Sequence, residues 1–362
     1  MSSAPLRRPR ASWQSHLVHL LVRVRMRPYA FRPIDPVWVR QNMGRPKGAR
    51  RFMARSTGAA SVVLPAIGSW PGGERIDWPS PSDHAPNGDM PNGDMPKGDS
   101  PVVLYLHGGG FIACSPETHR PLVSSLVRRI QGTAYVPAYR LAPEHPFPAA
   151  LDDARMAYRY LLDECNIAPS RLVIAGDSAG GGLALALALS LRDEGIPLPA
   201  AIVAFSPWTD LAATGQSLDE NSERCAMFAG DTIRRAARFY VGAADPQEPR
   251  LSPLYGNFHA LPPILIHASH DEVLRDDSVR LAERARSDGV EVEVRLWSRV
   301  PHVWQFFAAV LPEARESLDI ASRFIRDRVT DAVRARTTPH ELSRGAHTAQ
   351  KSITVGEHTP QA

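Results

Sequence analysis

The chain has 362 residues, of which 43% are hydrophobic, and it carries a formal charge of +4. No apolar run reaches the 18 or more residues of a membrane-spanning helix, so the sequence predicts no such span. Three widely separated cysteines, Cys114, Cys165 and Cys225, exclude a disulfide framework and a cysteine-based zinc site, which favours a cytoplasmic protein with reduced thiols.

The basic residues are concentrated at the N-terminus. Residues 1–55 contain thirteen Lys or Arg and one acidic residue, Asp35, whereas the rest of the chain has 29 basic and 37 acidic residues. No nucleic-acid-binding motif accompanies the basic segment, so nucleic acid is not an expected partner.

Residues 12–30 have the pattern of an amphipathic helix. Its apolar face is predicted to consist of Leu17, Leu20, Leu21 and Val24. Contact with a membrane surface and a targeting role are two alternatives, although more Arg rather than a cleavage site follows the apolar centre. We favour a helix that packs this face over the main domain, as part of an N-terminal helical cap within residues 1–60.

Residues 61–330 alternate between short apolar runs and helical patterns. Strands are predicted at 61–66, 102–107, 133–139, 171–175, 201–207, 262–269 and 290–297, and helices at 117–130, 149–164 and 276–288. This alternation predicts an α/β domain with a doubly wound, mostly parallel sheet. Functional groups in such sheets collect at the carboxyl ends of the strands.

Three segments stand apart from this pattern. Residues 79–101 include a five-residue repeat rich in Pro, Gly and Asp, which predicts a mobile surface loop. Residues 208–250 are irregular and are expected to contribute to the cap. Residues 331–362 are polar and aperiodic, which predicts a disordered tail.

The sequence LVIAGDSAGGG at residues 172–182 combines an apolar strand, a tight turn and an apolar helix. A G-x-S-x-G motif in this context exposes its serine above the edge of the sheet, so Ser178 is the candidate nucleophile. Glycines are needed on both sides because a Cβ there would collide with the neighbouring strand and helix.

A serine nucleophile needs a base and an acid that orients the base. These residues follow the serine in the order acid, then histidine, in this type of fold. His302 lies five residues beyond the last predicted strand, and Asp271 directly follows the strand at 262–269. Asp276 and Asp277 are assigned to the first turn of the next helix as ordinary N-terminal charges.

A glycine run, HGGG at residues 107–110, follows the strand at 102–107. Its backbone amides could stabilise an oxyanion together with the N–H of Ala179, the residue after the serine. Phosphate binding by this run is disfavoured because the nucleotide-binding glycine motifs are absent.

Six motifs together resemble the hormone-sensitive-lipase-like branch of the α/β-hydrolases, the bacterial family IV carboxylesterases. They are HGGGF (107–111), YRLAPEHPFPAALDD (139–153), GDSAGG (176–181), SPWTDL (206–211), DEVLRDD (271–277) and PHVWQFF (301–307), and the resemblance covers about residues 60–328. It implies an N-terminal helical cap, the catalytic residues Ser178, Asp271 and His302, and the oxyanion donors Gly108, Gly109 and Ala179. Gly182 departs from the Asn frequent in the family, and Asp271-Glu272 departs from its usual Asp-Pro.

Several apolar residues near these motifs are candidates for lining an acyl pocket, with a role in the core as the alternative. They are Phe111, Trp208, Met227, Phe228, Trp304 and Phe306.

The sequence therefore predicts a serine hydrolase that cleaves carboxylic esters of short to medium acyl chains and needs no metal or cofactor. A lactonase or acetyl-hydrolase acting on a secondary metabolite is the alternative. A non-catalytic small-molecule-binding protein of the same fold is a minor alternative, disfavoured by the presence of His302. The expected partner is a small ester, while a homodimer and peripheral membrane contact through the basic N-terminus stay open.

Overall fold

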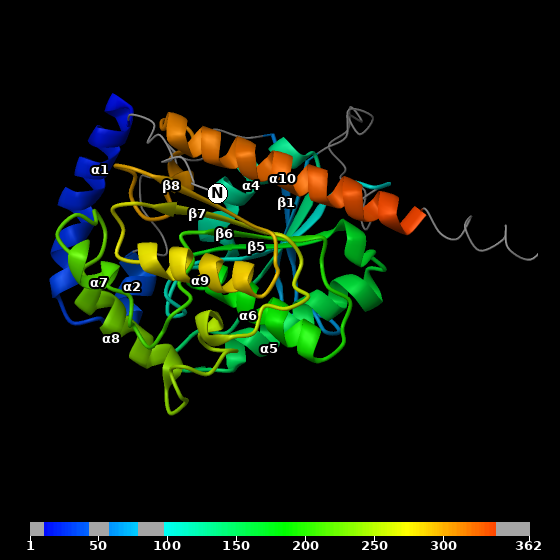
Figure 1. Cartoon of the computed structure of the whole chain (residues 1–362), viewed down its shortest axis with the longest axis horizontal. Coiled ribbons are helices and arrows are strands. Elements are labelled where there is room, and N and C mark those ends of the chain that lie inside the picture. The colour runs from blue at the N-terminus through cyan, green and yellow to red at the C-terminus, as the bar shows by residue number, and fades with distance from the viewer. Residues whose placement is uncertain (1–10, 43–57, 79–97, 338–362) are drawn as a thin grey trace, which may run out of the picture.

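The computed structural model describes residues 11–42, 58–78 and 98–337, and Figure 1 shows the whole chain. One eight-stranded sheet has the strand order β1-β2-β4-β3-β5-β6-β7-β8. Strands β1 and β2 pair antiparallel with their neighbours, and β4, β3, β5, β6, β7 and β8 are parallel. The prediction of a doubly wound, mostly parallel α/β sheet is confirmed. The strands are β1 (Ala60–Leu64), β2 (Gly73–Asp77), β3 (Val102–Leu106), β4 (Thr133–Pro137), β5 (Leu172–Asp177), β6 (Ala201–Phe205), β7 (Ile264–Ser269) and β8 (Val292–Trp297).

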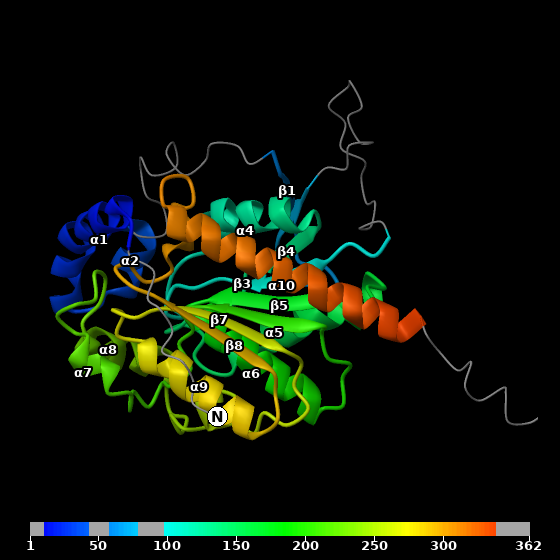
Figure 2. The same ribbon diagram turned by 45° about the horizontal axis from the view of Figure 1, so that its top comes forward.

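Helices cover both faces of the sheet. The α-helices of the described residues are α1 (Trp13–Met26), α2 (Pro36–Asn42), α4 (Pro116–Ile130), α5 (Ala149–Arg159), α6 (Ala179–Asp193), α7 (Ser217–Glu220), α8 (Gly230–Val241), α9 (Arg275–Ser287) and α10 (Pro312–Thr337). Helices α4 and α10 lie on one side of the sheet and α5, α6 and α9 on the other, while α1, α2, α7 and α8 gather at one end (Figure 2).

The buried strands send alternate side chains into two separate core layers. Leu104 and Ile174 belong to the layer beneath α5, α6 and α9, whereas Val103 and Val173 pack with α4 and α10. Because side chains alternate along a strand and both faces are covered, these strands are apolar throughout. This explains the continuous apolar runs of the sequence.

The C-terminal helix is longer than the sequence predicted. Helix α10 continues to Thr337, so residues 331–337 belong to a helix and not to a disordered tail. Leu318, Ala321, Ile325 and Val329 recur at helical spacing and are buried in the layer with α4. The remaining tail, residues 338–362, and most of the repeat loop, residues 79–97, lie outside the described residues.

The N-terminal helix forms as predicted, but with the opposite face against the protein. The residues of α1 that are buried are Ser15, Val18, His19 and Val22. The residues expected to pack on the domain are exposed instead: Leu17, Leu20, Leu21 and Val24. That prediction was wrong because Val18 and Val22 pack with Ala226, and the Ser15 hydroxyl donates to the Arg299 carbonyl at 2.5 Å.

Candidate active site

Ser178 occupies a strained turn between β5 and α6. Its φ of 52° and ψ of −123° lie outside the regions that most residues adopt. A Cβ on Gly180 would lie 2.0 Å from the Leu106 carbonyl oxygen, and one on Gly176 would lie 2.3 Å from the Gly180 oxygen. The predicted need for both glycines is confirmed, and the turn leaves the Ser178 side chain partly exposed.

His302 lies in the loop after β8 and is almost fully buried. Its Nδ1 is hydrogen-bonded to Oε2 of Glu272, whose other oxygen accepts a hydrogen bond from the Ser269 N–H at 2.6 Å. The Nε2 atom of His302 is also buried and has no hydrogen-bond partner among the described residues. The imidazole is therefore fixed on its Nδ1 side and unengaged on its Nε2 side.

Asp271 does not contact His302, so the prediction that Asp271 orients the histidine was wrong. Its Oδ2 accepts the Arg299 N–H at 2.7 Å, on the other side of the loop. The missed signal is the spacing Ser269-x-x-Glu272, in which Glu272 bonds back to the backbone of Ser269 as in a capping box. This bond turns Glu272 into the interior, just before the buried pair Val273 and Leu274.

The loops that carry Ser178 and His302 meet at the carboxyl end of β6. The Ser178 N–H donates to the Phe205 carbonyl at 2.8 Å, and the Val303 N–H donates to the Ser206 hydroxyl at 3.3 Å. Phe205 is the last residue of β6 and Ser206 follows it. One strand end therefore positions both the serine and the histidine, as expected for a parallel sheet.

The glycine loop after β3 leaves two of its three amides unengaged. The Gly108 N–H lies 3.2 Å from Asp177 Oδ1 and 3.2 Å from His119 Nε2, so it is already bonded within the protein. The prediction of Gly108 as an oxyanion donor therefore fails. The N–H groups of Gly109, Gly110 and Ala179 have no partner among the hydrogen bonds of the described residues. Gly110 was missed because the glycine run alone does not show which amides are already bonded within the protein.

Asp177, the last residue of β5, accepts the hydrogen bond from the Gly108 N–H of this loop. It is buried, and its carboxylate accepts a hydrogen bond from the Tyr105 hydroxyl at 2.8 Å. Burial raises the pKa of Asp177, but the interactions with His119 and the Tyr105 hydrogen bond outweigh burial and hold this pKa below its usual range. The Asp177 carboxylate thus stays charged and holds the Gly108 amide.

His107 fixes the start of the glycine loop. Its ring stacks on Tyr139 with centroids 4.2 Å apart, and the Tyr139 hydroxyl donates to the His107 carbonyl at 2.6 Å. Burial lowers the pKa of His107 to about 3, so its ring is neutral near neutral pH. The loop is therefore anchored by a neutral histidine.

The six candidate pocket residues are divided between two regions. Trp304 is fully buried in the core layer with α10, and its Nε1 donates to the Glu313 carbonyl at 3.2 Å, so it does not line a pocket. Phe228 places its ring 5.4 Å from that of His302, and Phe111 stacks on Tyr240 with centroids 3.7 Å apart. For Phe111, Trp208, Met227, Phe228 and Phe306, the pocket role stays a prediction.

Comparison with known proteins places this geometry in a family. A profile of the alpha/beta hydrolase fold matches residues 103–306. The chain is 43% identical over 225 residues to an acetyl-hydrolase of Streptomyces hygroscopicus, covering 62% of this chain and 75% of that protein. It is 39% identical over 261 residues to the carboxylesterase/phospholipase LipF of Mycobacterium tuberculosis, covering 68% of this chain and 69% of LipF.

Solved structures of esterases and lipases are also similar to this chain. The crystal structure of EstE5 has a TM-score of 0.77 and 34% identity, and covers 88% of this chain and 100% of EstE5. A hormone-sensitive lipase from a metagenome library also has a TM-score of 0.77, with 32% identity, and covers 89% of this chain and 100% of that chain. The chain belongs to the α/β-hydrolase fold family, and within it to the hormone-sensitive-lipase-like esterases.

Proposed function

We propose that this protein hydrolyses carboxylic esters of short to medium acyl chains through an acyl-enzyme on Ser178, with His302 as base and Glu272 as the acid that orients it. The observation that carries the proposal is the environment of His302. Its Nδ1 is held by Glu272, and its buried Nε2 has no partner among the described residues. This is the arrangement that a general base needs before substrate binds.

Glu272 selects the tautomer in which Nδ1 carries the proton, and Nε2 therefore presents a lone pair. As Ser178 Oγ forms a bond to the ester carbonyl carbon, Nε2 takes the hydroxyl proton. Glu272 is 1% exposed, so its negative charge stabilises the resulting imidazolium of His302 with little screening by solvent.

Addition to the carbonyl places negative charge on its oxygen. The N–H groups of Gly109, Gly110 and Ala179 are available to donate hydrogen bonds to this oxyanion, and loss of one such donor costs about 10²–10³ in rate. The intermediate then expels the alcohol, which takes the proton from Nε2. In the second half-reaction water gives its proton to Nε2 and attacks the acyl group, which releases the acid and restores Ser178.

Removal of acetyl groups is the second candidate. It is supported by the 43% identity to a protein named acetyl-hydrolase, and the same residues would serve an acetyl ester unchanged. The length of the preferred acyl chain separates this candidate from a broader esterase.

The test is hydrolysis of a p-nitrophenyl ester series, from acetate to palmitate, by the wild type, Ser178→Ala and Ser190→Ala. Ser190 is a matched control because it is buried on α6 and its hydroxyl donates to the Ala186 carbonyl of the same helix, at 3.0 Å. We expect turnover of short and medium esters by the wild type and Ser190→Ala, and none by Ser178→Ala. A folded wild type that hydrolyses no ester would contradict the proposal, and activity restricted to acetate would favour the acetyl-hydrolase.

A further inference from the structure

Exposed apolar side chains are concentrated in one N-terminal region. Eight of the twelve large exposed hydrophobic residues in the described part of the chain lie within residues 13–37. Five of them form a single stripe along α1, which we call the α1 stripe: Trp13, Leu17, Leu20, Leu21 and Val24. Trp13 and Val24, at its two ends, are 71% and 69% exposed, so the stripe faces solvent along the whole helix. A patch of this kind marks an interaction surface.

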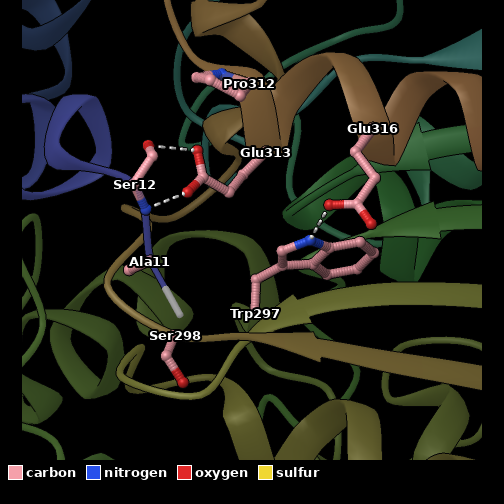
Figure 3. A pocket seen from close by; sticks show the side chains of 7 residues that line it. All are labelled: Ala11, Ser12, Trp297, Ser298, Pro312, Glu313 and Glu316. Atoms are coloured by element: carbon pink, nitrogen blue, oxygen red, sulfur yellow. Dashed lines mark hydrogen bonds between the residues drawn. The ribbon is translucent and has the colours of Figure 1, made fainter. Parts of the chain in front are cut away.

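The opposite face of α1 is held firmly to the body of the protein. Ser12, just before the helix, donates through its N–H and its hydroxyl to Glu313 of α10, at 2.7 and 3.0 Å (Figure 3). Arg27, just after the helix, donates to the Phe228 carbonyl at 2.6 Å. Both ends are therefore anchored, and the α1 stripe is fixed in an outward orientation.

The N-terminal segment that carries the stripe is basic in sequence. Residues 1–34 contain seven Arg and no Asp or Glu. Arg23 and Arg27 contact Glu223, at 3.8 and 3.3 Å, whereas Arg25 is exposed and has no ion-pair partner among the described residues. An apolar helix face flanked by arginines complements an anionic lipid surface. A second copy fits less well, because two α1 stripes brought together would face one another with like charges.

We propose that the α1 stripe docks the protein on an anionic lipid surface, with α1 lying in the plane of the interface. None of the helices in the described residues is long and apolar enough to cross a bilayer, so the contact is peripheral. The Phe228 carbonyl accepts Arg27, and the Phe228 ring lies against His302. Docking through α1 therefore holds the candidate active site close to the lipid surface and to esters dissolved in it.

Co-sedimentation of the full chain with vesicles tests this proposal. The probes are vesicles of phosphatidylcholine mixed with phosphatidylglycerol and vesicles of phosphatidylcholine alone, at low and high salt. The test variant combines Leu17→Gln, Leu20→Gln and Leu21→Gln. The matched control combines Val63→Gln and Ile67→Gln, two residues that are 71% and 61% exposed outside the α1 stripe.

We expect the wild type and the control to bind the anionic vesicles, and the triple variant to bind at least about tenfold more weakly. Binding of the wild type should weaken at high salt and on phosphatidylcholine alone. Trp13→Gln, at the exposed start of the helix, gives a second measurement if the triple variant misfolds. Ser178→Ala should bind as the wild type does, so loss of docking is distinguishable from loss of ester hydrolysis.

Two results would overturn the proposal. One is equal vesicle binding by the wild type, the triple variant and Trp13→Gln. The other is a wild-type dimer in sedimentation equilibrium without lipid that the triple variant converts to a monomer, because the stripe would then be an interface between two copies.

Discussion

His302 bonds through Nδ1 to Glu272, although Asp271 is the adjacent residue in the chain and also carries a carboxylate. Hydrogen bonds from backbone N–H groups determine which of the two carboxylates faces the histidine. Glu272 is fixed by the Ser269 N–H and is 1% exposed, whereas Asp271 is turned toward the Arg299 N–H and keeps 16% of its side chain exposed. The longer side chain of Glu272 reaches the histidine from a turn that directs Asp271 away from it.

Tyr105→Phe should cost about 1.5–3 kcal/mol in the free energy of unfolding, because it removes the Tyr105 hydrogen bond to the charged Asp177 carboxylate. Tyr158→Phe is the matched control, since the Tyr158 hydroxyl donates to a neutral carbonyl, that of Pro197, at 2.9 Å. Its cost should be about 1 kcal/mol. Urea unfolding of both variants measures the difference, and equal costs would show that Asp177 is not charged.

Gly180→Ala should destabilise the protein by about 1–3 kcal/mol or more and reduce ester hydrolysis, because the new Cβ would lie 2.0 Å from the Leu106 backbone oxygen. Gly181→Ala is the comparison on the same helix. Its Cβ would meet the Cβ and Cα of Pro207 at 3.0 and 3.1 Å, a milder overlap than that of Gly180→Ala, and alanine favours the helix by about 1 kcal/mol. Unfolding and activity are measured for both, and similar losses would contradict the proposed tightness of the serine turn.

His267→Asn should flatten the pH dependence of stability. Burial lowers the pKa of His267 to about 3, from the ordinary histidine value of about 6.5. Between these pH values the unfolded chain binds a proton that the folded chain does not, so stability falls as the pH falls, by up to about 1.4 kcal/mol per pH unit.

The Asn variant lacks this group, so its free energy of unfolding should fall less steeply over the same window. Its Nδ2 can still reach Ser317, the partner of His267 Nδ1 at 2.8 Å. The measurement is urea unfolding at several pH values across the window for the wild type and the variant. Parallel curves for the wild type and the variant would show that folding does not lower the pKa of His267, which would contradict the prediction.

Local sequence patterns were sufficient to predict the structure where a segment and its immediate neighbours determine its conformation. The apolar run before Ser178 and the glycines around it predicted the strand, turn and helix, because the collisions that exclude a Cβ arise within neighbouring segments. The position of His302 also followed from strand order, since each parallel strand delivers its carboxyl end to the same edge of the sheet.

The remaining features depend on contacts between distant segments. The pattern of α1 is apolar on two faces, and only the packing of Val18 and Val22 on Ala226 decides which face is buried. Likewise, Asp271 and Glu272 are both carboxylates beside a strand end, and the direction of each side chain depends on bonds to Arg299 and Ser269. The choice of Gly109 and Gly110 over Gly108 depends on Asp177, which lies on a neighbouring strand.

The most direct test of the account compares Glu272→Gln with Asp271→Asn in the hydrolysis of a short p-nitrophenyl ester. Glutamine keeps the shape of Glu272 but removes the charge that stabilises the imidazolium of His302, so kcat should fall by about 10³–10⁴ in a folded protein. Asp271→Asn should stay within a few-fold of the wild type, because Asp271 does not contact the histidine. A large loss in Asp271→Asn together with near-normal activity in Glu272→Gln would contradict the assignment of Ser178, His302 and Glu272 as the catalytic triad.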